Sequence, residues 1–175
     1  MDWYETVFEL IDMRSFSNLW FWIALAAVWS TASHYVIGVP FDMVPRAAKH
    51  GGQSERDLET LVQIRVNRLL FIAKVSGLWL VALTTAVLST LLVLGFWYGI
   101  EFAQAVALIA VPMTLVGLLS LSTARLIHMA DLHGEALRKR LIRHRHATQV
   151  IGMISIFVTA MWGMYQNMNV GPLGG

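Results

Sequence analysis

Four long stretches of this sequence contain no Asp, Glu, Lys or Arg. They cover residues 15–41, 75–100, 102–124 and 147–175. A helix needs about 20 apolar residues to cross the roughly 30 Å hydrocarbon core of a bilayer, at about 1.5 Å per residue. Each stretch is long enough and has a strongly apolar centre. The missing charge therefore predicts a protein that crosses a membrane several times.

The spans are expected to be helical, because an open strand in lipid would leave backbone N–H and C=O groups without partners. The alternating pattern of outer-membrane barrel strands is missing. The predicted spans are about residues 19–39, 72–96, 102–121 and 150–165. We therefore predict an all-α fold, an integral membrane four-helix bundle that forms a single membrane domain over residues 1–175. Segments 40–71 and 122–149 are predicted to be cytoplasmic helical extensions.

The composition narrows the function classes. Charged residues make up 14% of the chain, against about 25% in a soluble domain. The chain has no cysteine, which excludes disulfides, thiolate metal sites, thiol nucleophiles and cysteine-ligated clusters. No Gly-x-Ser-x-Gly elbow, phosphate loop or dinucleotide fingerprint occurs. An enzyme is therefore the less favoured class, and no cofactor is expected.

The basic residues predict the orientation of the chain. All Lys and Arg residues except Arg14 lie in the two extensions or in the first turn of the span that follows. The positive-inside rule then places the extensions in the cytoplasm and both termini outside the bacterial inner membrane, in a multi-pass arrangement. Aromatic residues cluster at the proposed outer boundary: Trp20, Phe21, Trp22, Trp97, Tyr98, Trp162 and Tyr165. The positive charge therefore indicates topology, and no nucleic acid partner is expected.

The N-terminal residues 2–14 are predicted to form an interfacial amphipathic helix. Apolar side chains lie on one side of this segment, and four acidic side chains lie opposite. Such a helix can rest in the outer interface or pack against the bundle or a neighbouring subunit. Its acidic character differs from the basic start of a secretory signal peptide. The first span is therefore expected to be retained.

Both extensions are expected to continue the spans as helices. One long helix should run from about Ser54 through the second span, with its first three turns standing in the cytoplasm, and the third span should continue similarly beyond its end. Glu135 and Lys139, four residues apart, can support the helix there as an ion pair. Small residues recur every four positions in two spans: Ser155, Thr159 and Gly163, and Ala26, Ser30, His34 and Gly38. Such stripes let membrane helices approach closely.

His34 is the only ionisable residue placed well inside a predicted span. Ionisable groups within the membrane are costly and suggest function, although a neutral histidine can also hydrogen-bond another helix. A structural role and a role as a ligand, proton or quinone site both stay open. His34 and His128 both belong to the cytoplasmic half of the protein, on the first and third helices. If these helices face each other, the two histidines could hold a haem.

The densest polar cluster lies just after the third span. On a continuing helix, His128, Asp131 and Glu135 would share a face, and these groups could hold a divalent metal or form an ordinary ion-paired surface. The basic side chains that follow could contact a protein partner or lipid phosphate. They are Arg138, Lys139, Arg140, Arg143 and Arg145.

The chain resembles a family of small bacterial inner-membrane proteins. The residues that carry the resemblance are the opening Met1–Tyr4, the stretch 13–20, the run 29–34, the stretch 38–42 and the later run 95–99. Some members of this family are labelled as a component of the SufBCD iron–sulfur assembly complex. That resemblance implies a docking partner that uses its two basic cytoplasmic segments.

The function that fits best is a non-enzymatic accessory or assembly subunit of the inner membrane, binding lipids and either other proteins or further copies of itself. The family resemblance links it to iron–sulfur assembly. One alternative is a small oligomeric channel or carrier, with Ser30, Ser33 and His34 facing the pathway. A second alternative is a quinone or haem redox protein that uses His34.

Overall fold

The computed structural model describes residues 15–169, and the predicted interfacial helix over residues 2–14 lies outside this range. The described chain is helical apart from one hairpin, which is made of two strands of two residues each. In chain order, the elements are η1 (Ser15–Ser17), α2 (Leu19–His34), β1 (Tyr35–Val36), β2 (Val39–Pro40), α3 (Met43–His50), α4 (Gly52–Leu92), the π-helical turn η2 (Val93–Trp97), α5 (Glu101–Met129) and α6 (Gly134–Asn169).

Within the described residues, three helices are long and apolar enough to cross a membrane. They are the helix from Gly52 to Trp97, α5, and α6 from Gly134 to Met168. The predicted spans 72–96, 102–121 and 150–165 each fall inside one of them. These helices confirm the three later predictions as far as length and composition can.

The first predicted span, 19–39, is wrong at its end. Helix α2 stops at His34, after 16 residues, or about 24 Å at 1.5 Å per residue. The chain then turns back in a hairpin that pairs Tyr35 with Pro40 and Val36 with Val39. Ile37 and Gly38 take positive φ angles of 53° and 75° at the turn. The apolar sequence continues past His34 because Val36 and Val39 are buried in a protein core.

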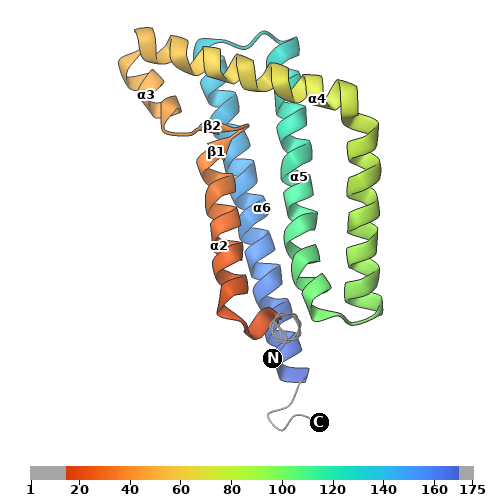
Figure 1. Cartoon of the computed structure of the whole chain (residues 1–175). Coiled ribbons are helices and arrows are strands. Elements are labelled where there is room, and N and C mark those ends of the chain that lie inside the picture. Colours follow the sequence, from red (N-terminus) through yellow and green to blue (C-terminus); the bar gives the residue numbers. More distant parts are fainter. Residues whose placement is uncertain (1–14, 170–175) are drawn as a thin grey trace, which may run out of the picture.

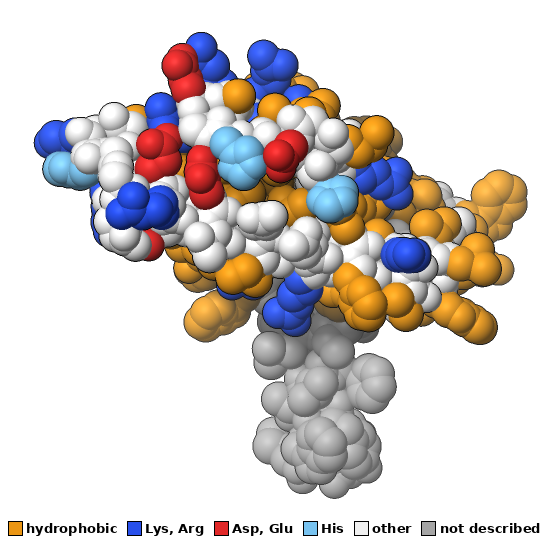
Figure 2. Space-filling view, turned by 90° about the horizontal axis from the view of Figure 1, so that it is seen from above, with side chains coloured by type: hydrophobic (Ala, Val, Ile, Leu, Met, Phe, Trp, Pro, Cys, Tyr) orange, Lys and Arg blue, Asp and Glu red, His pale blue; other side chains and the backbone are white. Residues whose placement is uncertain are grey.

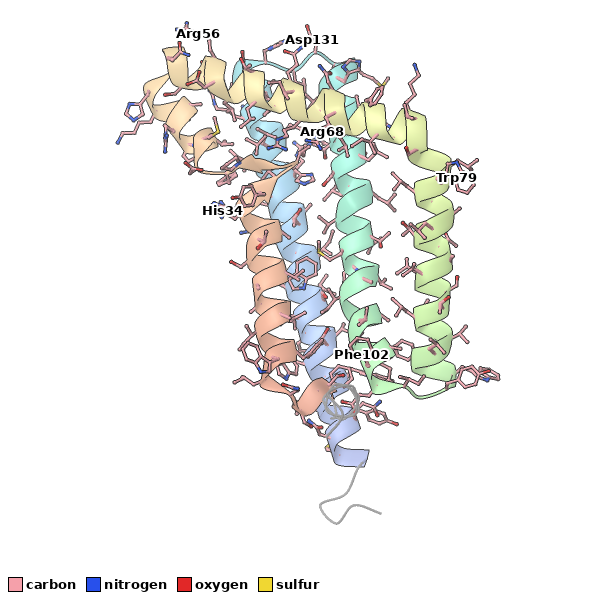
Figure 3. The ribbon with its side chains drawn as sticks, in the orientation of Figure 1. His34, Arg56, Arg68, Trp79, Phe102 and Asp131 are labelled. Carbon is pink, nitrogen blue, oxygen red and sulfur yellow. The ribbon has the colours of Figure 1, made fainter. Side chains whose placement is uncertain are left out.

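Helix α4 is continuous but bends (Figure 1). Its N-terminal part lies across the ends of α5 and α6, and its C-terminal part descends beside α5. The bend lies between Arg68 and Trp79, which Figure 3 labels on either side of it. Ser76 and Gly77 lie in this interval, and Gly/Ser pairs are a common cause of sharp helix kinks. The single helix predicted from Ser54 is confirmed. Its first turns lie flat over the ends of α5 and α6.

The largest hydrophobic core lies at one end of the molecule, where the hairpin, α3, the first part of α4, and the α5–α6 connection meet. We call this end the cap, covering residues 35–74 and 123–146. Its core consists of Val36, Val39, Val44, Ala47, Leu58, Val62, Val66, Ala124, Ile127, Leu137 and Leu141. Every one of these side chains is at most 6% exposed. The cap is therefore packed like a small water-soluble domain.

The long helices share a much smaller cluster below the cap. Leu25 and Trp29 of α2 pack with Val116 of α5, and Ile151 of α6 lies against them. No described residue of α4 belongs to this cluster, because α4 packs on α5 (Figure 1). The four helices therefore do not enclose one common core, as the predicted four-helix bundle would.

Helix α2 packs against small residues of α6. A Cβ atom added at Gly152 would lie 2.8 Å from Cε3 of Trp29, and one at Gly163 would lie 3.4 Å from Phe16 and Trp22. Ser155 and Thr159, on the same stripe, are buried. The α6 stripe predicted from spacing is therefore an interface. The second stripe is not, because Ala26, Ser30 and His34 are exposed and Gly38 lies in the hairpin turn.

Candidate functional sites

The descending part of α4 exposes two chemically different faces. One face repeats every three or four residues and contains small and hydroxyl-bearing side chains; we call it the seam. It consists of Val75, Leu78, Ala82, Thr85, Ser89 and Leu92, all of them exposed. The exposed face on the other side of α4 carries the large aliphatic side chains Leu80, Leu83 and Val87, together with Thr90. Spacing of three and four residues is that of packed helices, and small and hydroxyl residues mark helix contacts in membranes.

An apolar groove adjoins the seam. Its volume is about 390 Å³, and it lies between the end of α4, α5 and α6. Leu92 belongs to both the seam and the groove, and Pro112 and Ser155 line the opposite walls. The Ser155 hydroxyl donates to the Leu108 carbonyl at 3.4 Å. The surface offered beside α4 is therefore continuous and almost entirely apolar.

A buried glutamine fixes the end of α4 that is remote from the cap. Gln104 is 4% exposed, and its Nε2 donates to the Gly95 carbonyl at 2.8 Å. Its Oε1 accepts from Trp162 Nε1 at 3.0 Å and from Gln166 Nε2. Gly95 allows this approach, since a Cβ there would lie 2.9 Å from the Gln104 nitrogen. The sequence signal for this network was a single glutamine within an apolar helix.

The aromatic residues predicted at one boundary do lie at the same end of the molecule. Trp20–Trp22 begin α2, Trp97 and Tyr98 follow α4, and Trp162 and Tyr165 lie near the end of α6, all remote from the cap (Figure 1). The Phe96 and Trp162 rings are 5.3 Å apart. The opposite face of the molecule gathers charged side chains and histidines over the cap (Figure 2).

His34 does not lie deep in a helix interior. It is exposed at the last residue of α2, on the side of the molecule away from the descending part of α4 (Figure 3). It lines an open hollow with Ser30, Ser33 and Arg145. His128 is also exposed and lines a different, small hollow between α4 and α5. The structure therefore does not bring the two histidines to a shared site.

The predicted continuing helix around residues 128–135 is wrong. Helix α5 ends at Met129 and α6 begins at Gly134, with Asp131 at φ 45° and Gly134 at φ 54°. The helix must break here because α6 returns antiparallel to α5 (Figure 1). The proposed shared face of His128, Asp131 and Glu135 therefore does not form. The described residues contain no group of three or more potential metal-ligating side chains.

Acidic residues of α4 hold this turn instead. Glu59 Oε1 accepts from the backbone N–H of Gly134 at 2.6 Å, and Glu59 Oε2 lies 3.7 Å from His133 Nδ1. A carboxylate at a helix N-terminus is stabilised by the helix dipole. Glu55 pairs with Arg138. The turn is therefore clamped onto α4.

The five predicted contact residues of α6 differ sharply in their surroundings. Arg138 is paired with Glu55, and Lys139 lies 2.7 Å from Glu135. That neighbouring lysine lowers the pKa of Glu135 through a hydrogen bond and its charge. Arg140 is half-buried and its Nη2 lies 3.4 Å from the Thr123 hydroxyl. Arg143 is exposed, and Arg145 stacks over the Phe41 ring at 3.9 Å.

His144 is a buried polar residue that the sequence interpretation missed. It is 4% exposed between α5 and α6, and its ring nitrogens lie 3.1 Å from Thr123 Oγ1 and 3.5 Å from Ser120 Oγ. Burial, with the charge of Arg140, lowers the pKa of His144 to about 4. The available signal was periodicity, because His144 continues the buried row of Leu137 and Leu141.

No protein family model, curated protein or solved structure matches this chain.

Proposed function

We propose that this protein is a non-enzymatic accessory or assembly subunit of the bacterial inner membrane, and that it binds one transmembrane helix of a partner protein along the seam of α4. Its cap lies in the cytoplasm and its termini lie outside. The segregation of basic residues at the cap and exposed aromatic residues at the other end supports this orientation. The observation that carries the partner proposal is the difference between the two exposed faces of α4.

Lipid alone does not account for that difference. A face that meets only acyl chains has no need of small or hydroxyl side chains, and Leu80, Leu83 and Val87 are typical of such a face. On the seam, Ala82 allows close approach of a second backbone, and the Thr85 and Ser89 hydroxyls can hydrogen-bond across a helix interface. Neither hydroxyl has a side-chain hydrogen bond to another residue in the described range, whereas the Thr90 hydroxyl, on the aliphatic face, donates to the Ala86 carbonyl of its own helix.

The groove makes the same surface a three-sided site. A helix lying on the seam would also contact the walls formed by α5 and α6, since Leu92 belongs to both surfaces. Close packing of this kind drives helix association in membranes, where apolar burial by itself gives little. The seam and the two groove walls would therefore contact one bound helix on three sides.

The family resemblance adds that the partner belongs to iron–sulfur assembly. Within this proposal the cap would face the soluble assembly proteins, and the seam would hold a membrane-embedded component. Identification of the co-purifying protein by mass spectrometry tests this part separately.

The seam is tested by matched tryptophan substitutions. The wild type, Ala82→Trp and Leu83→Trp are purified from native membranes in mild detergent, and co-purifying proteins are quantified. We expect a stoichiometric membrane partner with the wild type and with Leu83→Trp, and its loss with Ala82→Trp. Recovery of this chain alone, or of complexes containing only this chain, would overturn the proposal.

A further inference from the structure

An open hollow of about 400 Å³ lies where the last turn of α2 meets α6. Its lining residues are Ser30, Thr31, Ser33, His34, Tyr35 and Arg145. We infer that this hollow binds the phosphate group of an anionic phospholipid from the cytoplasmic leaflet. The inference rests on the membrane placement proposed above, but not on the partner helix, because α2 and the descending part of α4 lie on opposite sides of the molecule (Figure 3).

Arg145 supplies the positive charge. Its guanidinium carbon lies 3.9 Å over the Phe41 ring, which holds the side chain in one position. Its Nε is shielded from solvent and has no hydrogen-bond partner. No described carboxylate forms an ion pair with it. The terminal Nη groups of this positioned guanidinium can meet a phosphate with the paired geometry that arginine offers.

The other residues that line the hollow offer hydrogen-bond donors, and none of them is Asp or Glu. Ser30 and Ser33 contribute hydroxyl groups, and His34 contributes a ring that can donate an N–H in either protonation state. A hollow with one cation, several donors and no carboxylate favours an anion over a cation.

The surface below the hollow favours a lipid over a free phosphate. On the same helix, Ile23, Ala26 and Ala27 are exposed one to two turns from Ser30, in the direction away from the cap. These side chains are apolar and mostly small, so an acyl chain can lie along them. The phosphate then lies at the end of α2, the level at which an inner-leaflet headgroup would lie.

Arg143 provides a matched control for Arg145. Both arginines are on α6, two residues apart, but Arg143 is exposed and does not line the hollow. Removing either charge changes the net charge of the protein equally. Only the Arg145 change removes a contact to the proposed phosphate.

The test is lipid binding by the full chain in mild detergent, counted by native mass spectrometry. The wild type, Arg145→Gln and Arg143→Gln are each titrated with phosphatidylglycerol, with phosphatidylcholine, and with inorganic phosphate as a competitor. We expect the wild type and Arg143→Gln to prefer phosphatidylglycerol, and Arg145→Gln to lose roughly tenfold in affinity for it, as for the loss of a charge-assisted hydrogen bond. Millimolar phosphate should not displace the lipid.

A second variant guards against misfolding of Arg145→Gln. The double change Ser30→Ala and Ser33→Ala removes two donors at the surface, and we expect a few-fold loss with an unchanged circular dichroism melt. Equal losses in the two arginine variants, no preference over phosphatidylcholine, or displacement by inorganic phosphate would each overturn the inference. Loss of the wild-type chain from carbonate-washed membranes would instead overturn the membrane placement itself.

Discussion

Helix α4 is one continuous helix in two different environments. In its first part, Leu58, Val62 and Val66 are each at most 2% exposed within the cap core. In its descending part, no residue of the most apolar 18-residue window is buried. The change takes place at the bend near Ser76 and Gly77, in the interval where Figure 3 shows α4 turning downward.

This difference in side-chain burial between the two parts of α4 matches the solvent proposed for each part. In water, burying apolar surface contributes about 25 cal/mol per Å², so an amphipathic helix packs its apolar stripe into a core. In lipid, apolar side chains gain little by leaving the solvent, and helices associate through close packing and polar contacts. The cap is therefore complete in itself, whereas the descending part of α4 still presents surface that a partner can use.

Truncation in the cap core should have the largest effect on stability. Leu141 is fully buried there, and Leu141→Ala should lower the free energy of unfolding by about 3 kcal/mol. Leu83 is 64% exposed on α4. Leu83→Ala should change the free energy of unfolding by less than about 0.5 kcal/mol. Denaturant unfolding in detergent micelles, followed by circular dichroism, measures both. Equal losses would remove the distinction between the two parts.

The polar network at the far end should come next. Gln104→Leu removes the partner of Trp162 and Gln166, and leaves the buried Gly95 carbonyl without its donor. We expect a loss of about 2 kcal/mol in the same unfolding measurement. Gln63→Leu, at an exposed position of the cap, is the control and should stay near the wild type. A neutral Gln104→Leu would show that this end is not held by the network.

Adding a single methyl group to the interface between α2 and α6 should lower the free energy of unfolding. Gly152→Ala places a Cβ against the Trp29 ring, and should cost about 1 kcal/mol or more of unfolding free energy through overpacking. Gly117→Ala meets no atom within 4 Å, and should be neutral or slightly stabilising, since alanine favours helix. Thermal melts of both variants check the opposite signs. A destabilised Gly117→Ala with an unaffected Gly152→Ala would contradict the assigned packing face.

The stability of the cap should also depend on pH. Because the pKa of His144 is lowered from 6.5 to about 4 in the folded protein, the unfolded chain binds a proton between these values and the folded chain does not. His144 therefore stabilises the fold fully above pH 6.5, and this contribution declines as the pH falls toward 4. We expect Tm to fall further in the wild type than in His144→Gln over this range, by several degrees.

The exposed His146 is the matched control for this measurement. His146→Gln should keep the pH dependence of the wild type. If it instead abolishes the dependence, the effect does not arise from burial between α5 and α6.

The sequence predicted the long helices well, because missing charge over more than twenty residues has few explanations. It did not predict the end of α2, since Val36 and Val39 are equally apolar in a span and in a hairpin. Nothing in the sequence indicated that Ile37 would take a positive φ angle. The break before α6 had a local signal in Gly134, which the surrounding helical spacing obscured.

The candidate sites could be predicted only in part. His34 and Arg145 were each identified as candidates from the sequence. That they line the same hollow depends on how α2 packs against α6. The seam of α4 follows a visible spacing, yet the sequence alone does not say which face of α4 meets α5. Side-chain burial decides that, and it left Ala82, Thr85 and Ser89 on the outer side.

A photocrosslinking scan along α4 in native membranes tests the central claim most directly. A photoreactive amino acid is placed singly at seven positions: Leu78, Ala82, Thr85 and Ser89 on the seam, and Leu80, Leu83 and Val87 on the aliphatic face. We predict adducts with one partner protein at the four seam positions, and only lipid adducts at the other three. Equal protein adducts on both faces, or none on the seam, would contradict a partner helix bound there.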